Sequence, residues 1–409
     1  MGIRLGFHYH VPAEQGSDGI VMPGFQGRFL DALAGHCDEL VCFLHTPRPE
    51  ERALLDYRIQ SLNTSLVAVG EHGSVPRRVL LGRHYAARIK TRRKQLDAVL
   101  LRGPSPLLPT MAHGAASLPS ILLLVGDCSQ GIDDLPQPCW RKQLIRLWWL
   151  WYKHRQNSVA RHCLTFVNSQ NLFDEMRPHV PQLHQTRTTT LTSSDFHYRE
   201  DTCHSAPYHL LYTGRMDRGK GILNMVEAIA VLASEGTHAV LDLVGPLEKS
   251  DPVVEELTVL AKRRNIIDRV HYHGYKALGP ELFNFYKRAD MYVIASNNES
   301  FPRTIWEAMA HSLPVVATRV GSIPKFIEGA AKLVSPNNVG ELVAAIRYVI
   351  CDGRDRRDMI RKGREIASEM TLDKQVGKML TTIEQWLSSH QGASGLSMAS
   401  RNALQDARA

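Results

Sequence analysis

Cysteine is sparse in this 409-residue sequence, and long apolar runs are missing. The seven cysteines are scattered, odd in number and free of CxxC spacing. This pattern excludes a disulfide framework or a cysteine-ligated zinc cluster and favours a reducing, cytoplasmic compartment. No stretch of about 18 apolar residues runs free of charge, so no membrane-spanning helix is expected. The first eleven residues predict a β-strand rather than a secretory signal, so any membrane contact should be peripheral.

The composition is that of an ordinary globular protein, with 44% hydrophobic and 22% charged residues. A chain of this length is expected to form two domains. The net charge of +8 and the pI near 9.1 favour anionic partners, which include nucleotide phosphates, anionic lipid headgroups and nucleic acid.

Short apolar runs alternate with helical stretches in both halves of the chain, which predicts βαβ units and mostly parallel sheets. We therefore predict an α/β protein with two doubly wound, Rossmann-like domains that bind ligands in the crevice between them. The predicted units are an N-terminal domain (1–190), a linker (191–207), a second domain (208–371), a helix that packs back on the first domain (372–389) and a disordered tail (390–409).

A glycine-rich loop is predicted between a strand and a helix at residues 213–221, with the sequence TGRMDRGKG. Backbone amides near Gly214 and the start of the following helix would attract an anion, and Arg215 and Lys220 add full charges. The loop is interpreted as a diphosphate cradle, although a purely structural strand-to-helix turn would have the same glycines.

Two glutamates, Glu299 and Glu307, flank the predicted start of another helix after the strand at 291–295. Carboxylates placed in this way can bind different hydroxyls of one polyhydroxylated ligand. Alternatively, both are ordinary acids near a helix N-terminus.

The wider sequence context resembles the donor-binding region of glycosyltransferase family 4, a group of retaining enzymes with the two-domain GT-B fold. The resemblance rests on RADMYVIAS, NNESFPRTIWEAMAHSLPVVATRVGSIPKFI and AKLVSPNN, and on the GRxxxxKG loop. It covers roughly residues 208–350 strongly. It implies a GT-B architecture with the acceptor bound by residues 1–190 and the nucleotide-sugar donor by residues 208–371.

The resemblance also implies roles for single residues. Arg215 and Lys220 would neutralise the donor diphosphate, and Glu307 would bind the ribose. The transferred sugar would contact Glu299 together with Ser300 and Phe301, and the base would lie near Gly274 and Tyr275. No metal and no cofactor other than the donor substrate is expected.

The N-terminal half departs from the family pattern. Gly24 and Gly27 supply a version of the family's glycine-rich phosphate loop. Asp127 stands near a position where the family commonly has a histidine, and it either replaces that histidine or begins an Asx turn. Three further positions differ from the family pattern. Ser312 and Ser322 stand where the family often has glycine, and Lys325 stands where it often has an acidic residue.

Basic residues are dense at 76–94 and 140–155, and the second stretch also holds Trp148, Trp149, Trp151 and Tyr152. Basic and aromatic side chains on one helix suit an anionic membrane surface. The alternative is a solvated face above a core stripe of Leu144, Leu147, Trp148 and Trp151. His8 and His10, on the first predicted strand, are expected to be structural or solvated rather than catalytic.

The function predicted from these features is retaining transfer of a hexose-type sugar from a nucleotide diphosphate to an acceptor, which could be a lipid-linked glycan or a polysaccharide precursor. The chain would be cytoplasmic or peripheral on a membrane. A sugar-nucleotide epimerase or hydrolase on the same fold is an alternative. A basic nucleic-acid-binding protein is another, but no recognition module supports it.

Overall fold

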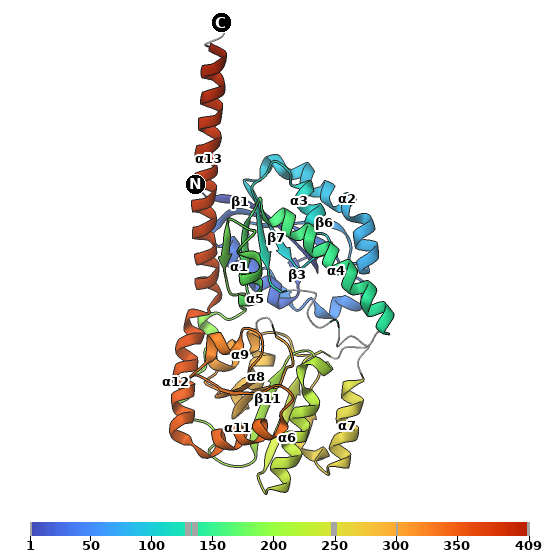
Figure 1. The fold of residues 1–409 in the computed structure, drawn as a ribbon, viewed down its shortest axis with the longest axis vertical. Coiled ribbons are helices and arrows are strands. Elements are labelled where there is room, and N and C mark those ends of the chain that lie inside the picture. The colour runs from blue at the N-terminus through green and yellow to red at the C-terminus, as the bar shows by residue number, and fades with distance from the viewer. Residues whose placement is uncertain (1, 127–131, 133–137, 247–251, 300–301, 407–409) are drawn as a thin grey trace.

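The computed structural model describes residues 2–126, 132, 138–246, 252–299 and 302–406, with side chains as far as Ser389. The chain forms two α/β domains that lie one above the other in Figure 1. Each is built around a parallel sheet. The predicted fold class is confirmed.

The N-terminal sheet has, among the described residues, seven parallel strands in the order β10-β9-β8-β7-β1-β4-β6. The direction of strand addition reverses between β1 and β7, which makes this pair the topological switch point. The strands are β1 (Ile3–Pro12), β4 (Cys37–Thr46), β6 (Thr64–Glu71), β7 (Ala98–Gly103), β8 (Ser120–Leu124), β9 (Leu164–Val167) and β10 (Leu183–Gln185).

Helices cover both faces of this sheet, and a small antiparallel sheet, β2-β3-β5, follows β1. The sequence analysis did not predict the small sheet, because its strands have only two to four residues. Their bounds are Glu14–Gly16, Gly19–Met22 and Tyr57–Arg58. The helices are α1 (Gly24–Ala34), α2 (Val75–Arg92), α3 (Leu108–Gly114), α4 (Cys139–Ala160) and α5 (Gln170–Met176), and a 3₁₀ helix spans Pro49–Leu54.

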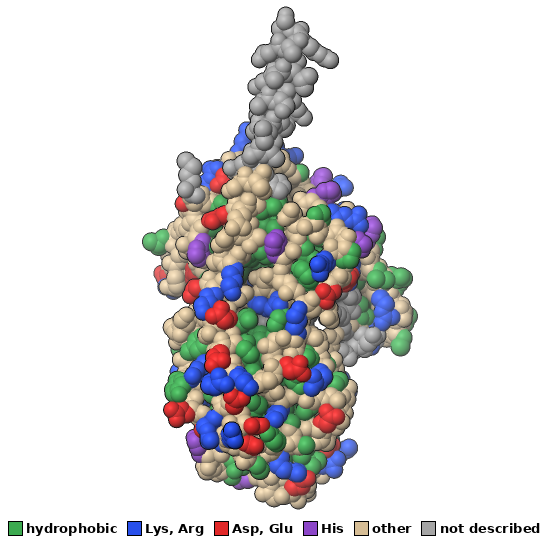
Figure 2. All heavy atoms as spheres, turned by 60° about the vertical axis from the view of Figure 1, so that its left-hand side comes forward, with side chains coloured by type: hydrophobic (Ala, Val, Ile, Leu, Met, Phe, Trp, Pro, Cys, Tyr) green, Lys and Arg blue, Asp and Glu red, His purple; other side chains and the backbone are tan. Residues whose placement is uncertain are grey.

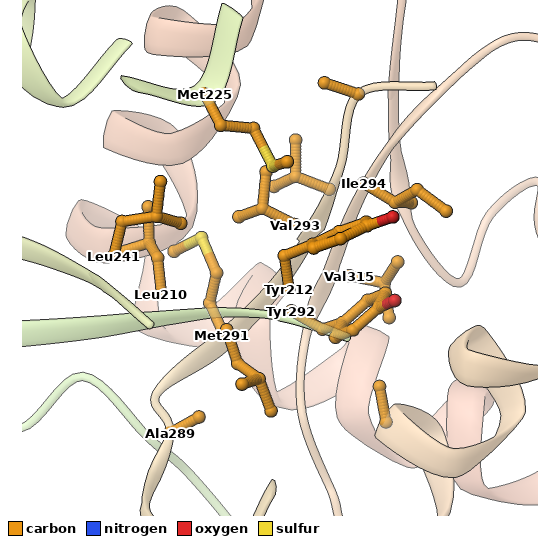
Figure 3. Close-up of a cluster of buried hydrophobic side chains, with 14 of the residues drawn as sticks. Leu210, Tyr212, Met225, Leu241, Ala289, Met291, Tyr292, Val293, Ile294 and Val315 are labelled. Carbon is orange, nitrogen blue, oxygen red and sulfur yellow. The ribbon is translucent and has the colours of Figure 1, made fainter. Parts of the chain in front are cut away.

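The C-terminal sheet has six parallel strands in the described part of the chain, in the order β13-β12-β11-β14-β15-β16. Its switch point lies between β11 and β14. Figure 3 shows the core beside these two strands, where Tyr212 and Tyr292 lie among Met225, Val293 and Ile294. The strands are β11 (Tyr208–Thr213), β12 (Ala239–Val244), β13 (Val270–Tyr272), β14 (Met291–Ile294), β15 (Val315–Thr318) and β16 (Lys332–Val334).

The helices of this domain are α6 (Ile222–Ser234), α7 (Val253–Arg263), α8 (Pro280–Arg288), α9 (Arg303–Ala310), α10 (Ile323–Ile327), α11 (Val339–Cys351) and α12 (Gly353–Glu369). Figure 2 shows basic and acidic side chains interspersed on the face that carries α12. Arg361 on this helix pairs with Asp358 (2.7 Å) and Glu365 (2.8 Å), as expected for a solvated helix face.

The last helix, α13 (Leu372–Asp406), returns to the N-terminal domain (Figure 1). Its apolar residues, from Leu372 to Leu387, belong to the same buried cluster as Phe7 of β1 and Leu30 of α1. The helix continues through residues 390–406, where the sequence analysis expected a disordered tail. The physical reason is that this segment contains many good helix formers, such as alanine, leucine, methionine and glutamine, and no proline.

Candidate active site

Two loops meet where β11 and β14 end, at the switch point of the C-terminal sheet. One loop runs from Gly214 to Gly221 and the other begins at Ser296. Lys220 Nζ lies 2.8 Å from Glu299 Oε1, and the hydroxyl of Ser296 donates to the same oxygen at 2.7 Å. The amide of Asn297 donates to Gly219 O at 2.8 Å. The structure therefore brings together two of the predicted site residues that are 79 positions apart.

Glycines without a side chain permit this close approach. Gly221 has a φ of 66°, and a Cβ atom there would lie 2.0 Å from Ala295 O. Gly321, which the sequence analysis did not single out, has a φ of 53°, and a Cβ atom would lie 1.6 Å from Glu299 O. The backbone next to the Glu299 carboxylate is thus fixed by a glycine that follows β15.

Arg215 lies at the exposed rim of the same loop. Its side chain is 62% accessible, and its guanidinium is 3.4 Å from Asp217 Oδ2. The carbonyl of Arg215 accepts from the buried Tyr212 hydroxyl at 3.1 Å, and Gly214 N donates to Val244 O at 2.9 Å. The backbone of the loop is therefore anchored, while the Arg215 side chain remains available to a ligand.

Glu307 is buried rather than open to the cleft. Its Oε1 accepts from the Thr190 hydroxyl at 3.0 Å, and its Oε2 accepts from the Tyr286 hydroxyl at 2.8 Å. Burial, followed by the nearby Glu307 charge, raises the pKa of Tyr286 well above its usual value, so this hydroxyl keeps its proton. The donors are of the same chemical type as the ribose hydroxyls that the sequence analysis expected here. Each oxygen has a second lone pair for a further donor.

Gly274 and Tyr275 follow β13 at the same edge of the sheet. Gly274 has a φ of 69°, and no described heavy atom lies within 4 Å of the position that its Cβ would take. The Tyr275 hydroxyl donates to Asp56 Oδ2 at 2.5 Å, which links this loop to the N-terminal domain.

Asp56 also binds the backbone amide of Gly24. Its Oδ1 accepts from Gly24 N at 2.7 Å, so the first amide of α1 is already occupied. A Cβ atom at Gly27 would lie 2.2 Å from the ring of Tyr57, which explains that glycine by packing. These contacts account for both glycines without a phosphate.

Ser300, Phe301 and Asp127 lie outside the described residues.

The two domains are held together by charged and polar contacts that the sequence did not reveal. Arg28 of α1 pairs with Asp195 of the linker at 2.5 Å and donates to Thr190 O at 3.1 Å. On the C-terminal side, the Arg303 guanidinium lies 5.4 Å from the centre of the Phe25 ring. These side chains become neighbours only through the folding of both domains, so no local sequence pattern could have identified them.

The departures from the family pattern have local explanations. Ser312 has a φ of 58°, which explains the usual glycine, and its hydroxyl accepts from Arg199 N (3.1 Å) and donates to His197 O (2.9 Å). Ser322 Oγ accepts from Gln170 N at 3.3 Å, and Lys325 donates to the Gln170 side chain. Two of the three departures thus contribute contacts between the domains.

Among the residues that the structure describes, one group of side chains could hold a metal ion. Asp242 of β12 lies beside His271 and His273, and the three offer ligand atoms within 4.8 Å of one another. Asp242 already accepts hydrogen bonds from His273 (2.7 Å) and His209 (3.0 Å). This chemistry fits a divalent transition metal, but the protein's own hydrogen bonds also account for the arrangement.

Helix α4 differs from the stripe that the sequence analysis considered. Leu144, Leu147 and Trp151 are more than half exposed, so they form no core stripe. Tyr152, which is not part of that stripe, is instead buried, and its hydroxyl donates to Ser105 O. The reason is that α4 contacts the domain through the Tyr152–Gln156–Ala160 side, and the other side faces solvent.

The two facing domains, with their switch points at the cleft, define the GT-B class of architecture. Sucrose-phosphate synthase from Thermosynechococcus elongatus superposes with a TM-score of 0.72 at 17% identity, over 95% of this chain and 100% of that one. Anabaena HepE in complex with UDP-glucose gives a TM-score of 0.69 at 17% identity, over 93% and 100%. At these identities the likeness shows the fold.

The sequence of the C-terminal domain is similar to a known family. Residues 198–366 match the model of the glycosyl transferases group 1, in the half of the chain where the motifs predicted the resemblance. A D-inositol 3-phosphate glycosyltransferase from Arthrobacter sp. (strain FB24) is 32% identical over 158 residues, 38% of this chain and 37% of that protein. An MMP alpha-(1->4)-mannosyltransferase from Mycolicibacterium hassiacum is 29% identical over 239 residues, 56% of each chain. These matches span from a third to about half the length of the curated relatives.

Proposed function

We propose that this protein is a retaining glycosyltransferase that moves a hexose-type sugar from a nucleoside-diphosphate sugar to an acceptor. The observation that carries the proposal is the contact of Lys220 with Glu299 at the switch point of a group 1 glycosyltransferase domain. A cation for a diphosphate and a carboxylate for sugar hydroxyls then lie side by side. The structurally similar HepE, whose crystal structure is in complex with UDP-glucose, supports a donor of this kind.

The donor would lie along the carboxyl edge of the C-terminal sheet. The base would stack near Gly274, the ribose would hydrogen-bond to Glu307, and Lys220 and Arg215 would neutralise the diphosphate. As the sugar–phosphate bond breaks, negative charge develops on the leaving nucleotide, and a positioned cation stabilises that charge. These two cations supply the charge that a divalent metal would otherwise provide, so we propose that the reaction needs no metal.

Retention is assigned to attack on the face from which the phosphate leaves. Glu299 is engaged by Lys220 and Ser296, which suits a carboxylate that accepts hydrogen bonds from sugar hydroxyls better than a free nucleophile. The acceptor hydroxyl would then transfer its proton to the departing phosphate oxygen, and the new bond would form with the anomeric configuration kept.

The acceptor is proposed to be a glycan or a lipid-linked glycan reached at an anionic membrane surface. Within the described residues, no helix is both long and apolar enough to cross a bilayer. Helix α4 instead exposes Trp140 (67%), Leu147 (64%) and Trp151 (54%) beside several basic residues. Next to it, an open groove of about 1630 Å³ lies between α2, α3 and α4, with Leu80, Arg83, Lys90 and Arg155 in its lining. Exposed aromatic and basic side chains together favour an anionic interface.

The test is transfer by the purified chain from a panel of nucleotide sugars, with and without EDTA, with the anomeric configuration of the product read by NMR. We expect an α-linked product from an α-linked donor, and we expect EDTA to cause no loss of transfer activity. Full activity of both Lys220→Ala and Glu307→Ala would refute the site. Free epimerised or hydrolysed sugar without acceptor would support the alternative enzyme class.

Membrane contact is tested separately, by sedimentation with vesicles of phosphatidylglycerol and phosphatidylcholine. Replacement of Trp140 and Trp151 by serine should release the protein from anionic vesicles without changing its activity on a soluble acceptor. Equal sedimentation of the variant and the wild-type protein would refute this surface.

A further inference from the structure

Five basic or imidazole side chains gather at the carboxyl end of the N-terminal sheet. His8 and His10 come from β1 and His45 from β4, whereas His72 follows β6 and Arg78 lies in the first turns of α2. The ring centroid of His45 is 6.2 Å from that of His8 and 5.6 Å from that of His72. We call these five residues the basic cluster.

Every member of the basic cluster has a buried nitrogen without a hydrogen-bond partner among the described residues. His8 and His45 each place Nδ1 against a carbonyl, that of Phe43 (2.7 Å) and that of Gly70 (3.2 Å), and leave Nε2 unpartnered. The guanidinium of Arg78 leaves both Nε and Nη1 unpartnered. Buried polar atoms are normally paired, so this concentration of unpaired atoms indicates a ligand.

The buried arginine of the basic cluster also lacks an ion-pair partner. Arg78 is only 7% exposed. The nearby carboxylate of Glu51 is already engaged by Arg48 and by His72, each at 2.7 Å, and Glu71 pairs with Arg77 at 2.9 Å. In the described chain, no carboxylate lies within ion-pair distance of Arg78. A buried cation without a counter-ion is costly, and an anionic ligand would remove that cost.

Burial and the Arg78 charge keep the imidazoles of His8 and His10 neutral. Burial lowers the pKa of His8 to about 4 with a contribution from the Arg78 charge, whereas the hydrogen bond with the Phe43 carbonyl opposes this shift. Burial and then Arg78 lower the pKa of His10 to about 2. A neutral imidazole nitrogen can accept a hydrogen bond from a hydroxyl or from a protonated oxyanion, while Arg78 donates to the other oxygens of that group.

The basic cluster lies at the carboxyl edge of the N-terminal sheet, where ligands of doubly wound domains bind. His8 and His10 belong to β1, one of the two strands that form the switch point of this sheet. The position of the cluster is therefore that of a ligand site in the domain to which the sequence analysis assigned the acceptor.

We propose that the basic cluster binds a phosphate-type oxyanion carried by the acceptor, with Arg78 as its principal ligand. This inference rests on the proposed function, because it names the chemical class of the acceptor. The oxyanion could belong to a soluble sugar phosphate or to a lipid phosphate. The two sources share the chemistry that the cluster recognises.

Direct binding is measured by titrating the full chain with inorganic phosphate at constant ionic strength, with no nucleotide sugar present. Arg78→Gln should weaken phosphate binding roughly tenfold or more. The matched control is Arg77→Gln, which removes the same charge one residue away from an exposed pair with Glu71 and should bind as the wild-type chain does. Equal binding by Arg78→Gln and the wild type would overturn the proposal.

A phosphate titration in saturating UDP distinguishes whether the basic cluster binds a phosphate of the acceptor or the diphosphate of the donor. Phosphate should still bind at Arg78 when UDP is present, whereas complete competition would assign the basic cluster to the donor diphosphate and overturn the acceptor assignment. A failure of sugar transfer in the activity assay would leave the phosphate titration interpretable, so the failures of the two proposals can be told apart.

A purely structural role for Arg78 predicts a different result. In chloride buffer Arg78→Met should unfold at the same temperature as the wild type or higher, because it removes an uncompensated buried charge. Phosphate should raise the unfolding temperature of the wild type but not that of the variant. If Arg78→Met unfolds at a much lower temperature than the wild type in chloride buffer, and phosphate does not change this difference, the proposal is overturned.

The source of the oxyanion is distinguished with acceptors. Arg78→Gln should raise KM for phosphorylated acceptors and leave KM for their unphosphorylated counterparts unchanged. A soluble sugar phosphate that serves as acceptor identifies the soluble source, and activity confined to phospholipid-linked acceptors identifies the lipid source. Equal KM changes for phosphorylated and unphosphorylated acceptors would overturn the proposal.

Discussion

The hydroxyl of Thr190 donates a hydrogen bond of 3.0 Å to Glu307, a residue 117 positions further along the chain. Thr190 ends the N-terminal domain, and Glu307 lies on the helix that follows the Glu299 loop. The Glu307 carboxylate, which is proposed to bind the ribose, therefore also forms a contact between the domains. Ligand binding at Glu307 and the relative position of the domains should be coupled through this one carboxylate.

Lys220→Met should remove most of the transferase activity but change the stability of the fold only slightly. The lysine is the cation nearest to Glu299, and removal of one preorganised group that stabilises developing charge lowers kcat by roughly 100- to 1,000-fold. The measurement is kcat with saturating donor. Lys332→Met, which removes a lysine that lies 3.7 Å from Asp355 elsewhere in the domain, is the matched control and should keep full activity.

Tyr286→Phe should destabilise the C-terminal domain by about 1–3 kcal/mol, because it leaves Glu307 Oε2 buried without its donor. The hydroxyl also contacts Thr213 Oγ1 at 2.6 Å. Urea denaturation measures the change in the free energy of unfolding. Tyr198→Phe, at an exposed hydroxyl, should change it by no more than about 0.5 kcal/mol, and similar losses in the two variants would contradict the role of the buried hydroxyl.

Gly321→Ala should displace the Glu299 loop. The new methyl group would lie 1.6 Å from Glu299 O, so the loop must move in addition to the cost of about 1–2 kcal/mol for a non-glycine residue at positive φ. Gly236→Ala has a similar φ of 81° and free space around it, so it should show the conformational cost alone. Donor affinity, measured by calorimetry, should fall only in Gly321→Ala. An equal fall in both variants would contradict the argument.

Stability should decrease as the pH falls below about 6.5. Burial lowers the pKa of His8 to about 4 and that of His45 to about 3, against an ordinary value of 6.5. Between these values the unfolded chain binds protons that the folded chain does not, so the free energy of unfolding falls by about 1.4 kcal/mol per pH unit for each histidine. Above about pH 6.5 the contribution is complete and constant.

Urea denaturation between about pH 7 and about pH 5 in chloride buffer tests this dependence. His8→Gln should reduce the slope by the share of one histidine, while His36→Gln, at an exposed position, should leave it unchanged. A pH-independent free energy of unfolding for the wild-type chain would contradict the burial argument.

The fold and the donor loops were predictable because their signals are local. Alternating apolar runs and helices predict parallel sheets, and residues that follow two strands of one sheet meet at its carboxyl edge. This is why Lys220 and Glu299 could be placed near each other from the sequence. The family resemblance added the separate roles of Glu299 and Glu307 and the order of the motifs.

Contacts between distant segments could not be predicted. Thr190, Asp56 and Gly321 have no motif of their own, and each acquires its contact only when the two domains or two strands come together. For Ser312 the sequence showed the position but not its cause. The family often has glycine there, and the positive φ of Ser312 in the structure gives the reason. The orientation of α4 was also hidden, because its apolar residues occur around much of its circumference.

The path of α13 has a consequence for the synthesis of the protein. The chain passes between the domains twice, and the two crossings touch where Leu372 N donates to Leu191 O at 2.7 Å. Because α13 supplies Leu380, Ile383 and Trp386 to the first domain's core, that domain leaves the ribosome before the residues that complete it. A nascent N-terminal domain therefore exposes an apolar strip until α13 has been synthesised, and it is completed only after the C-terminal domain that follows it in the chain.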